Sequence, residues 1–162
     1  MQTPVVVQPD LSSRPFAASA SRQMAAAPPV IFRAWTEQLD RWFAMPGTLL
    51  MRPGVNAPYF FETHHAGERH PHYGRILRLV DNHIVEMTWL NAGGTNGYET
   101  VLTVTLAPAG TGTMLRVHHA GFPNADLAER HRQAWPVVLE MLDGIYQPAG
   151  SADGAQDAAA AG

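Results

Sequence analysis

Apolar and polar residues alternate along much of the chain between residues 59 and 120. Val85, Met87 and Trp89 share one side of the pattern, whereas Glu86 and Thr88 share the other. A period of two is typical of strands that bury one face and expose the other, as in an antiparallel sheet. The pattern therefore predicts strands at residues 48–52, 59–65, 72–80, 83–90, 98–107 and 113–120, preceded by an opening strand at 14–24.

Turn residues separate the predicted strands. Ala66-Gly67-Glu68 lies between two of them, Asp81-Asn82 lies between the next two, and residues 108–112 contain proline and two glycines. Residues of these types favour the tight turns that join neighbouring antiparallel strands. We therefore expect a run of hairpins.

Two parts of the chain show helical spacing instead. After Pro28-Pro29, apolar residues recur as far as Phe43, and Thr36-Glu37 divides the stretch into two short helices. A longer helix is expected at residues 124–146, where Asn124 can cap the first turn. Its apolar face comprises Leu127, His131, Trp135, Val138, Leu142 and Ile145.

A long apolar helical face needs a broad surface to cover it, and the predicted sheet is the only candidate. We therefore expect an α+β fold in which a curved antiparallel sheet of about six or seven strands closes around the C-terminal helix. Two short helices follow the first strand. Residues 1–13 are expected to form a flexible leader, residues 14–147 the domain and residues 148–162 a disordered tail, because the tail is rich in Gly, Ala and Asp.

Composition narrows the chemistry that is available. The 162 residues include no cysteine and no lysine, which excludes disulfides, thiolate catalysis and Schiff-base chemistry. Serine occurs only near the two ends of the chain, so we expect no serine nucleophile in the body of the domain. Any catalysis would be general acid–base catalysis by groups such as histidine. We also expect no cofactor.

Charge and hydropathy bear on partners and location. The net charge is −3 and the arginines are scattered, so neither nucleic acid nor a membrane surface is an expected partner. The first residues lack a basic segment followed by a long apolar stretch, which argues against a secretory signal. We expect a cytoplasmic protein, and the abundance of Ala, Gly and Arg without Lys suggests a bacterial one.

Several motifs occur in order along residues 14–147. They are residues 30–35 (VIFRAW), 39–43 (LDRWF), 67–75, 84–89 (IVEMTW), 119–122 (HAGF) and 135–139. Together they resemble the START and Bet v-type superfamily, also called SRPBCC, and within it the branch named after the activator of the heat-shock-protein-ninety ATPase. The resemblance implies a helix-grip fold, in which sheet and C-terminal helix enclose an apolar pocket.

Candidate site residues follow from the faces assigned to the sheet and the helix. His119 shares a face with Leu115 and Val117, and His131 lies one turn before Trp135, so both are expected near a pocket mouth. His119, His131 and Tyr73 are the candidate catalytic groups. The expected ligand-binding residues are Phe61, Tyr73, Met87, Trp89, Val104, Val117, His119, His131, Trp135 and Val138.

A second group of polar residues gathers in one predicted hairpin. His64, His65, His70 and His72 lie around Gly67, and imidazoles that converge could bind zinc or copper. Alternation places His64 and His65 on opposite faces, so we expect no metal site. On the following strand, either Arg75 or Arg78 could enter the pocket to meet an anionic ligand group.

Three functions are compatible with these residues. The first is the binding of a small apolar organic molecule between sheet and helix. The second is an enzyme of the polyketide cyclase or dehydratase type that uses acid–base chemistry. The third is a protein-interaction module like the chaperone activator, which predicts an exposed apolar patch and contact with a chaperone. The sequence does not specify whether the chain forms oligomers.

Overall fold

The computed structural model describes residues 3–148, so the expected tail at 148–162 lies outside the described residues except for Pro148. Strands and helices follow one another in the expected order. They are β1 (Phe16–Met24), α1 (Pro28–Thr36), α2 (Leu39–Trp42), β2 (Pro58–His65), β3 (Glu68–Val80), β4 (Ile84–Trp89), β5 (Thr100–Ala109), β6 (Gly112–Phe122) and α3 (Ala125–Ile145).

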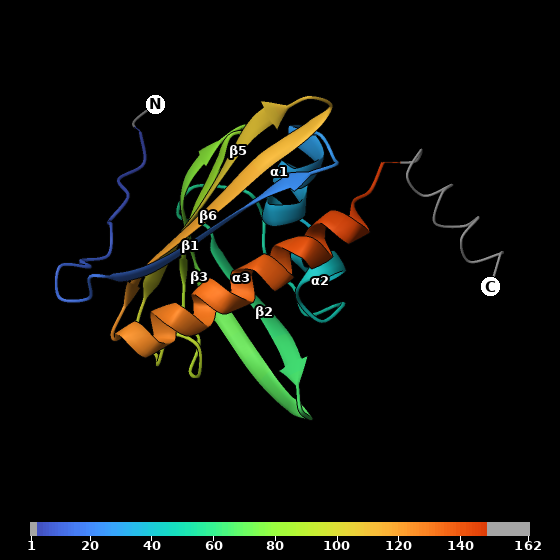
Figure 1. Ribbon diagram of the computed structural model, residues 1–162. Coiled ribbons are helices and arrows are strands. Elements are labelled where there is room, and N and C mark those ends of the chain that lie inside the picture. The colour runs from blue at the N-terminus through green and yellow to red at the C-terminus, as the bar shows by residue number, and fades with distance from the viewer. Residues whose placement is uncertain (1–2, 149–162) are drawn as a thin grey trace.

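The six strands form one antiparallel sheet in the order β1-β6-β5-β4-β3-β2 (Figure 1). Strands β2 to β6 are neighbours in sequence and in space, whereas β1 adds to the far edge beside β6. The connection from β1 to β2 therefore crosses the width of the sheet, and it contains α1 and α2. This confirms the expected α+β helix-grip fold.

Helix α3 crosses one face of the curved sheet and packs mainly against β1 (Figure 1). Asn124 caps it as expected, because its side chain accepts a hydrogen bond from the Leu127 backbone N–H at 3.0 Å. Ile145, the last residue of the expected apolar face, is instead 50% exposed beside a hollow at the helix end. Within residues 3–148, no helix combines the length and the apolar character needed to cross a membrane.

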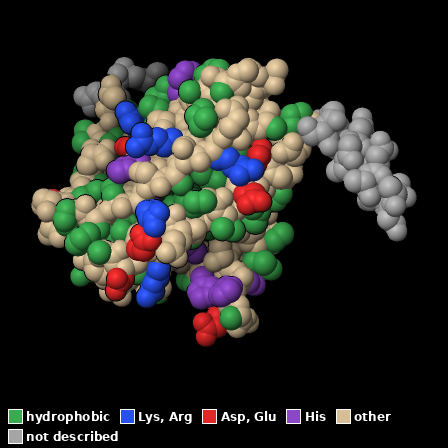
Figure 2. Space-filling model, in the orientation of Figure 1, with side chains coloured by type: hydrophobic (Ala, Val, Ile, Leu, Met, Phe, Trp, Pro, Cys, Tyr) green, Lys and Arg blue, Asp and Glu red, His purple; other side chains and the backbone are tan. Residues whose placement is uncertain are grey.

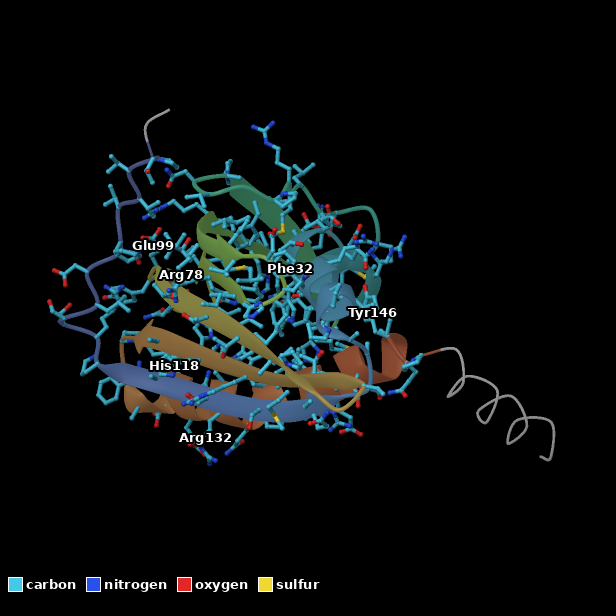
Figure 3. All side chains as sticks on the ribbon, turned by 90° about the horizontal axis from the view of Figure 1, so that it is seen from above. Phe32, Arg78, Glu99, His118, Arg132 and Tyr146 are labelled. Atoms are coloured by element: carbon cyan, nitrogen blue, oxygen red, sulfur yellow. The ribbon has the colours of Figure 1, made fainter. Side chains whose placement is uncertain are left out.

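The core lies between the sheet and the three helices, and Figure 3 shows side chains filling this space. Alternation predicted its sheet side correctly, since Val85, Met87 and Trp89 are at most 3% exposed. Trp35 of α1 adds its ring from the helical side, with its centroid 6.2 Å from that of Trp135. Burial of these large side chains supplies most of the driving force for folding.

Most strand boundaries lie within two residues of the predicted ones, and the larger differences occur at two places. Residues 48–52 do not form a strand, because a single bridge joins Leu50 to Phe60 between the breaks at Gly47 and Pro53. Strand β3 begins at Glu68 instead of residue 72. Ala66 and Gly67 alone make the turn, both with positive φ (53° and 78°), which matches the twist of paired strands and lengthens the hairpin.

The N-terminal segment before β1 lies against the ends of several strands. Asn56 donates a side-chain hydrogen bond to the Val5 carbonyl at 2.9 Å, and Arg75 donates one to the Val7 carbonyl. Arg14 donates to the carbonyls of Gly121 and Glu99 at 2.8 and 2.6 Å. These contacts connect the segment to β3, β6 and the loop before β5.

Ser19 corrects the expectation that serines near the chain ends lie outside the body of the domain. It lies in the middle of β1 opposite His118 of β6, with its Oγ 2.8 Å from His118 Nδ1. His118 is exposed on the sheet surface that faces away from the core (Figure 3). The expectation failed because β1, although early in the chain, pairs with the last strand.

Candidate functional site

The space enclosed by the sheet and α3 is mostly filled, and a cavity of about 140 Å³ remains next to Trp89 and Trp135. It is surrounded by side chains from β3, β4, α3 and the segments that follow α2 and β4. Its lining residues are Phe43, His72, Trp89, Asn91, His131, Ala134, Trp135 and Val138. The cavity is therefore aromatic and apolar, with three polar side chains at its wall.

Two larger hollows, of about 510 and 670 Å³, lie at the other end of α3. They are lined by the segment 25–27, the turn between β5 and β6, the end of α3 and the residues that follow it. Among the described residues, neither has a histidine or a tryptophan in its lining. The smaller cavity is therefore the candidate functional site, because it joins the aromatic core to buried histidines.

His72 is held as a neutral imidazole at one wall of the cavity. Its ring stacks on Phe61 with centroids 4.8 Å apart. Its Nδ1–H donates to the His70 carbonyl at 3.0 Å, and its Nε2 accepts from the Asn91 amide at 2.7 Å. The backbone N–H of Thr95 donates to Asn91 Oδ1, which orients that amide. Burial lowers the pKa of His72 to about 4, so the ring is uncharged near neutral pH.

His119 is fully buried behind the cavity, and both of its ring nitrogens are occupied. The Trp135 indole N–H donates to Nδ1 at 3.3 Å. The Nε2–H must then donate to Thr100 Oγ1 at 2.7 Å, and the Thr100 hydroxyl donates to the Trp89 carbonyl at 2.5 Å. Burial holds the pKa of His119 well below its ordinary value. Protonation would break the bond from Trp135, so this histidine orients the indole of a cavity residue.

His131 has a different environment on the first half of α3. Its Nδ1–H donates to the Leu127 carbonyl one turn earlier, at 2.8 Å, and burial lowers its pKa. The ring lies 5.0 Å from His119 and 4.5 Å from Phe122 between centroids. None of the hydrogen bonds found within residues 3–148 uses its Nε2. His131 therefore lines the cavity with a ring whose Nε2 has no hydrogen-bond partner among the described residues.

The structure brings together only some of the expected ligand-binding residues. Trp89, His131, Trp135 and Val138 line the cavity. Phe61 and His119 lie directly behind it, in contact with His72 and Trp135 respectively. The remaining residues lie elsewhere: Met87, Val104 and Val117 are fully buried core residues, and Tyr73 is 45% exposed outside the cavity.

Four lining residues were absent from the expected ligand-binding set: Phe43, His72, Asn91 and Ala134. His72 was missed because Tyr73 was assigned to the inward face; Tyr73 is in fact 45% exposed, so alternation turns its neighbour His72 inward. Phe43 and Ala134 carry no such signal. Neither Arg75 nor Arg78 is among the lining residues, and they contact Val7 and Glu86 instead.

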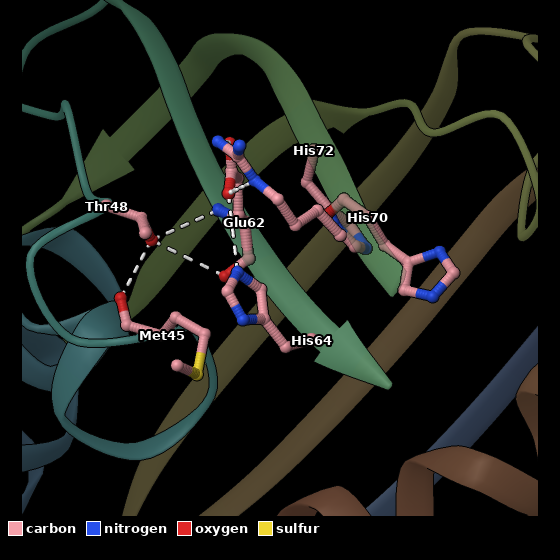
Figure 4. Close-up of polar contacts among 7 residues, drawn as sticks. Met45, Thr48, Glu62, His64, His70 and His72 are labelled. Atoms are coloured by element: carbon pink, nitrogen blue, oxygen red, sulfur yellow. Dashed lines mark hydrogen bonds and ion pairs between the residues drawn. The ribbon is translucent and has the colours of Figure 1, made fainter. Parts of the chain in front are cut away.

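The hairpin histidines do not converge on one point. His64 lies 3.4 Å from Glu62, between their Nε2 and Oε2 atoms, as Figure 4 shows. Arg69 holds the same carboxylate with two hydrogen bonds of 2.8 and 2.6 Å, and these bonds lower the pKa of Glu62. The rings of His65 and His70 are 6.5 Å apart. Among the described side chains, no group of three or more His, Asp or Glu residues is placed to hold a metal ion.

Comparison with known proteins gives a family and a set of similar folds. The family model described as "Activator of Hsp90 ATPase homolog 1-like protein" matches residues 25–147. No curated protein sequence matches the chain.

Solved structures from several organisms are similar to the fold. Protein CV1439 of Chromobacterium violaceum is 26% identical, with a TM-score of 0.69 over 83% of this chain and 99% of its own. Protein MLL2253 of Mesorhizobium loti is 24% identical, with a TM-score of 0.67 over 80% and 95%. An HSP90 activator from Plasmodium falciparum is 16% identical, with a TM-score of 0.60 over 74% and 87%. The last two similarities concern the fold alone.

Proposed function

This chain belongs to the family of activator of Hsp90 ATPase homolog 1-like proteins, and we propose that it binds a small, largely apolar molecule in the cavity between β4 and α3. The observation that carries the proposal is the cavity wall. Trp89, Trp135 and Val138 supply apolar surface, and His131 Nε2 is a hydrogen-bond acceptor without a partner within residues 3–148. Such a wall favours an aromatic ring that carries one donor group.

The size of the cavity limits the bound group. A volume of about 140 Å³ is close to the cavity of about 150 Å³ that holds benzene in another protein, and below the range of drug-sized pockets. A single ring buries about 150–250 Å² of surface, which contributes about 4–6 kcal/mol at 25 cal/mol per Å². We expect a dissociation constant of about 1 mM for a ring alone. This corresponds to about −4.1 kcal/mol, or about −0.7 kcal/mol for each of six ring atoms, which lies within the range for small ligands.

Binding of phenol and of benzene tests the proposal. We expect both to stabilise the protein against heat and to shift the NMR resonance of the Trp135 indole N–H. Phenol should bind more tightly, because its hydroxyl can donate to His131 Nε2. A failure of both compounds to bind at millimolar concentration would contradict the proposal.

Adjacent positions on α3 provide a matched pair of variants. Val138 lines the cavity, whereas the side chain of Val137 is 67% exposed. Val138→Phe should fill the cavity and abolish binding, and Val137→Phe should leave it unchanged. Equal binding by the two variants would place the ligand elsewhere.

Acid–base catalysis has weaker support from the geometry. Of its candidate groups, His119 has both nitrogens occupied, and Tyr73 lies outside the cavity. His131 alone keeps a free lone pair at the cavity. We therefore consider ligand binding better supported by the geometry than catalysis.

A protein-interaction role is a second candidate because α3 exposes apolar side chains on its outer side. Val137, Met141 and Ile145 recur every four residues and are 67%, 42% and 50% exposed. Side chains at this spacing lie along one helix face, which suits contact with an Hsp90-type ATPase. Met141→Asp should then weaken binding to such a chaperone in a pull-down or calorimetric assay, and an unchanged affinity would exclude this surface.

A further inference from the structure

A second, polar pocket of about 300 Å³ adjoins the apolar cavity. It lies between the tip of the β2–β3 hairpin and the loop that follows β4. His72 and Asn91 line both spaces, so each of these side chains has the cavity on one side and the polar pocket on the other. A ligand whose ring occupies the cavity could therefore place its other end in the polar pocket.

The hairpin contributes potential donors to this pocket. His65 and His70 both line it, with ring centroids 6.5 Å apart, and Figure 2 shows histidine side chains gathered at this end of the molecule. Arg69 also lines it. The Nε and Nη2 atoms of Arg69 bind Glu62, and none of the hydrogen bonds described within residues 3–148 uses its Nη1. Imidazoles and a guanidinium favour an anion.

The opposite wall contributes backbone donors. Asn91 and Thr95 brace the loop, because the Asn91 N–H donates to Thr95 Oγ1 at 3.1 Å and the Thr95 N–H donates to Asn91 Oδ1 at 2.9 Å. Residues 92–94 lie between them and line the pocket. No hydrogen bond found among the described residues uses their three backbone N–H groups. Successive free N–H groups in a turn form a concavity that suits an anion.

No carboxylate among the lining residues opposes this arrangement. Of the two acidic residues in the hairpin, Glu62 is paired with Arg69, and Glu68 lies opposite His65 in the strand register without lining the pocket. The pocket therefore has donors on two sides and, among residues 3–148, no acidic side chain in its wall.

We propose that the polar pocket binds the carboxylate of an aromatic carboxylic acid whose ring occupies the apolar cavity. This inference rests on the proposed function, and it adds the class of ligand and a second set of binding residues. His72 and Asn91 would lie beside the short linker between ring and carboxylate.

The test compares 3-phenylpropanoate with its uncharged analogue 3-phenylpropanol by isothermal titration at low salt, where attraction between charged groups is least screened. The wild-type protein should bind the acid at least about tenfold more tightly than the alcohol, because hydrogen bonds to a charged group are the stronger ones. The double variant His65→Gln/His70→Gln should lose this preference and keep the affinity for the alcohol. His64→Gln is the matched control, since His64 does not line the pocket, and it should retain the preference.

Each outcome has a distinct meaning. Equal affinity for the acid and the alcohol in the wild-type protein would overturn the polar-pocket inference and leave binding in the cavity intact. A preference for the acid that persists in the double variant would also overturn the inference, because the anion would lie elsewhere. If neither compound binds, the proposed function fails together with the inference. Circular dichroism of each variant, matching that of the wild type, checks that all retain the fold.

Discussion

Acidification should destabilise this protein before its carboxylates begin to protonate. His72 and His119 lie beneath α3 and His131 belongs to it; all three are neutral imidazoles, and burial lowers the pKa of each. In the unfolded chain they regain the ordinary value of 6.5. Below that pH the unfolded chain binds protons that the folded protein excludes. The stability is therefore complete above neutral pH and falls as the pH drops through 6.5.

The size of the effect follows from His72. Its pKa moves from 6.5 to about 4, and each unit corresponds to about 1.4 kcal/mol. Between about pH 7 and pH 5 only part of this difference is realised, which gives a loss of about 2 kcal/mol from His72 alone. His119 and His131 act in the same direction. A loss of this size is a large share of the free energy of unfolding of a typical domain, about 5–15 kcal/mol.

Urea unfolding followed by circular dichroism at the two pH values measures the loss. His72→Phe keeps a ring that can stack on Phe61 and removes the titrating group, so this variant should lose about 2 kcal/mol less than the wild type on acidification. His83 is exposed, and His83→Phe serves as the matched control that should behave like the wild type. A wild-type free energy of unfolding that is equal at the two pH values would refute the reasoning.

Three further predictions concern single contacts, each measured as the free energy of unfolding. Asn124→Ala should cost about 1 kcal/mol, because it removes the cap of α3; an unchanged stability would mean that water replaces the cap. Gly74→Ala should cost about 2 kcal/mol, since a Cβ there would lie 2.3 Å from the Thr88 carbonyl oxygen; a neutral result would show that the strands separate easily. Thr100→Val should cost about 1–3 kcal/mol, because it leaves the buried Nε2–H of His119 without its acceptor and removes the hydroxyl bond to the Trp89 carbonyl. Full stability of that variant would contradict the assigned hydrogen-bond chain.

The candidate site was only partly predictable. Trp89, Trp135 and Val138 were assigned to the interior from periodicity, and all three line the cavity. The volume of the cavity did not follow from periodicity, because it is what remains after all neighbouring side chains have packed. Met87 and Val104 face inward as expected but fill the core instead of lining the space.

The histidines show even more clearly that periodicity alone does not predict the site. Sequence position placed His119 and His131 near one another, and the structure has their rings 5.0 Å apart. Whether each ring has a nitrogen free for a ligand depends on hydrogen-bond partners from other elements. Thr100 and Trp135 occupy both nitrogens of His119, whereas His131 keeps its Nε2 free within the described residues.

The sequence by itself predicted most of the elements, their order, the hairpins between successive strands and the inward faces of strands such as β4, because alternation, helical spacing and turn residues are local properties of the chain. Tertiary structure alone decided which segments distant in the chain became neighbours. It placed β1 beside β6, which brought Ser19 to His118. It also brought Asn91 to His72, so that one pair of side chains separates an apolar cavity from a polar pocket. Contacts between residues distant in sequence depend on how all the side chains pack together, and no local pattern encodes that packing.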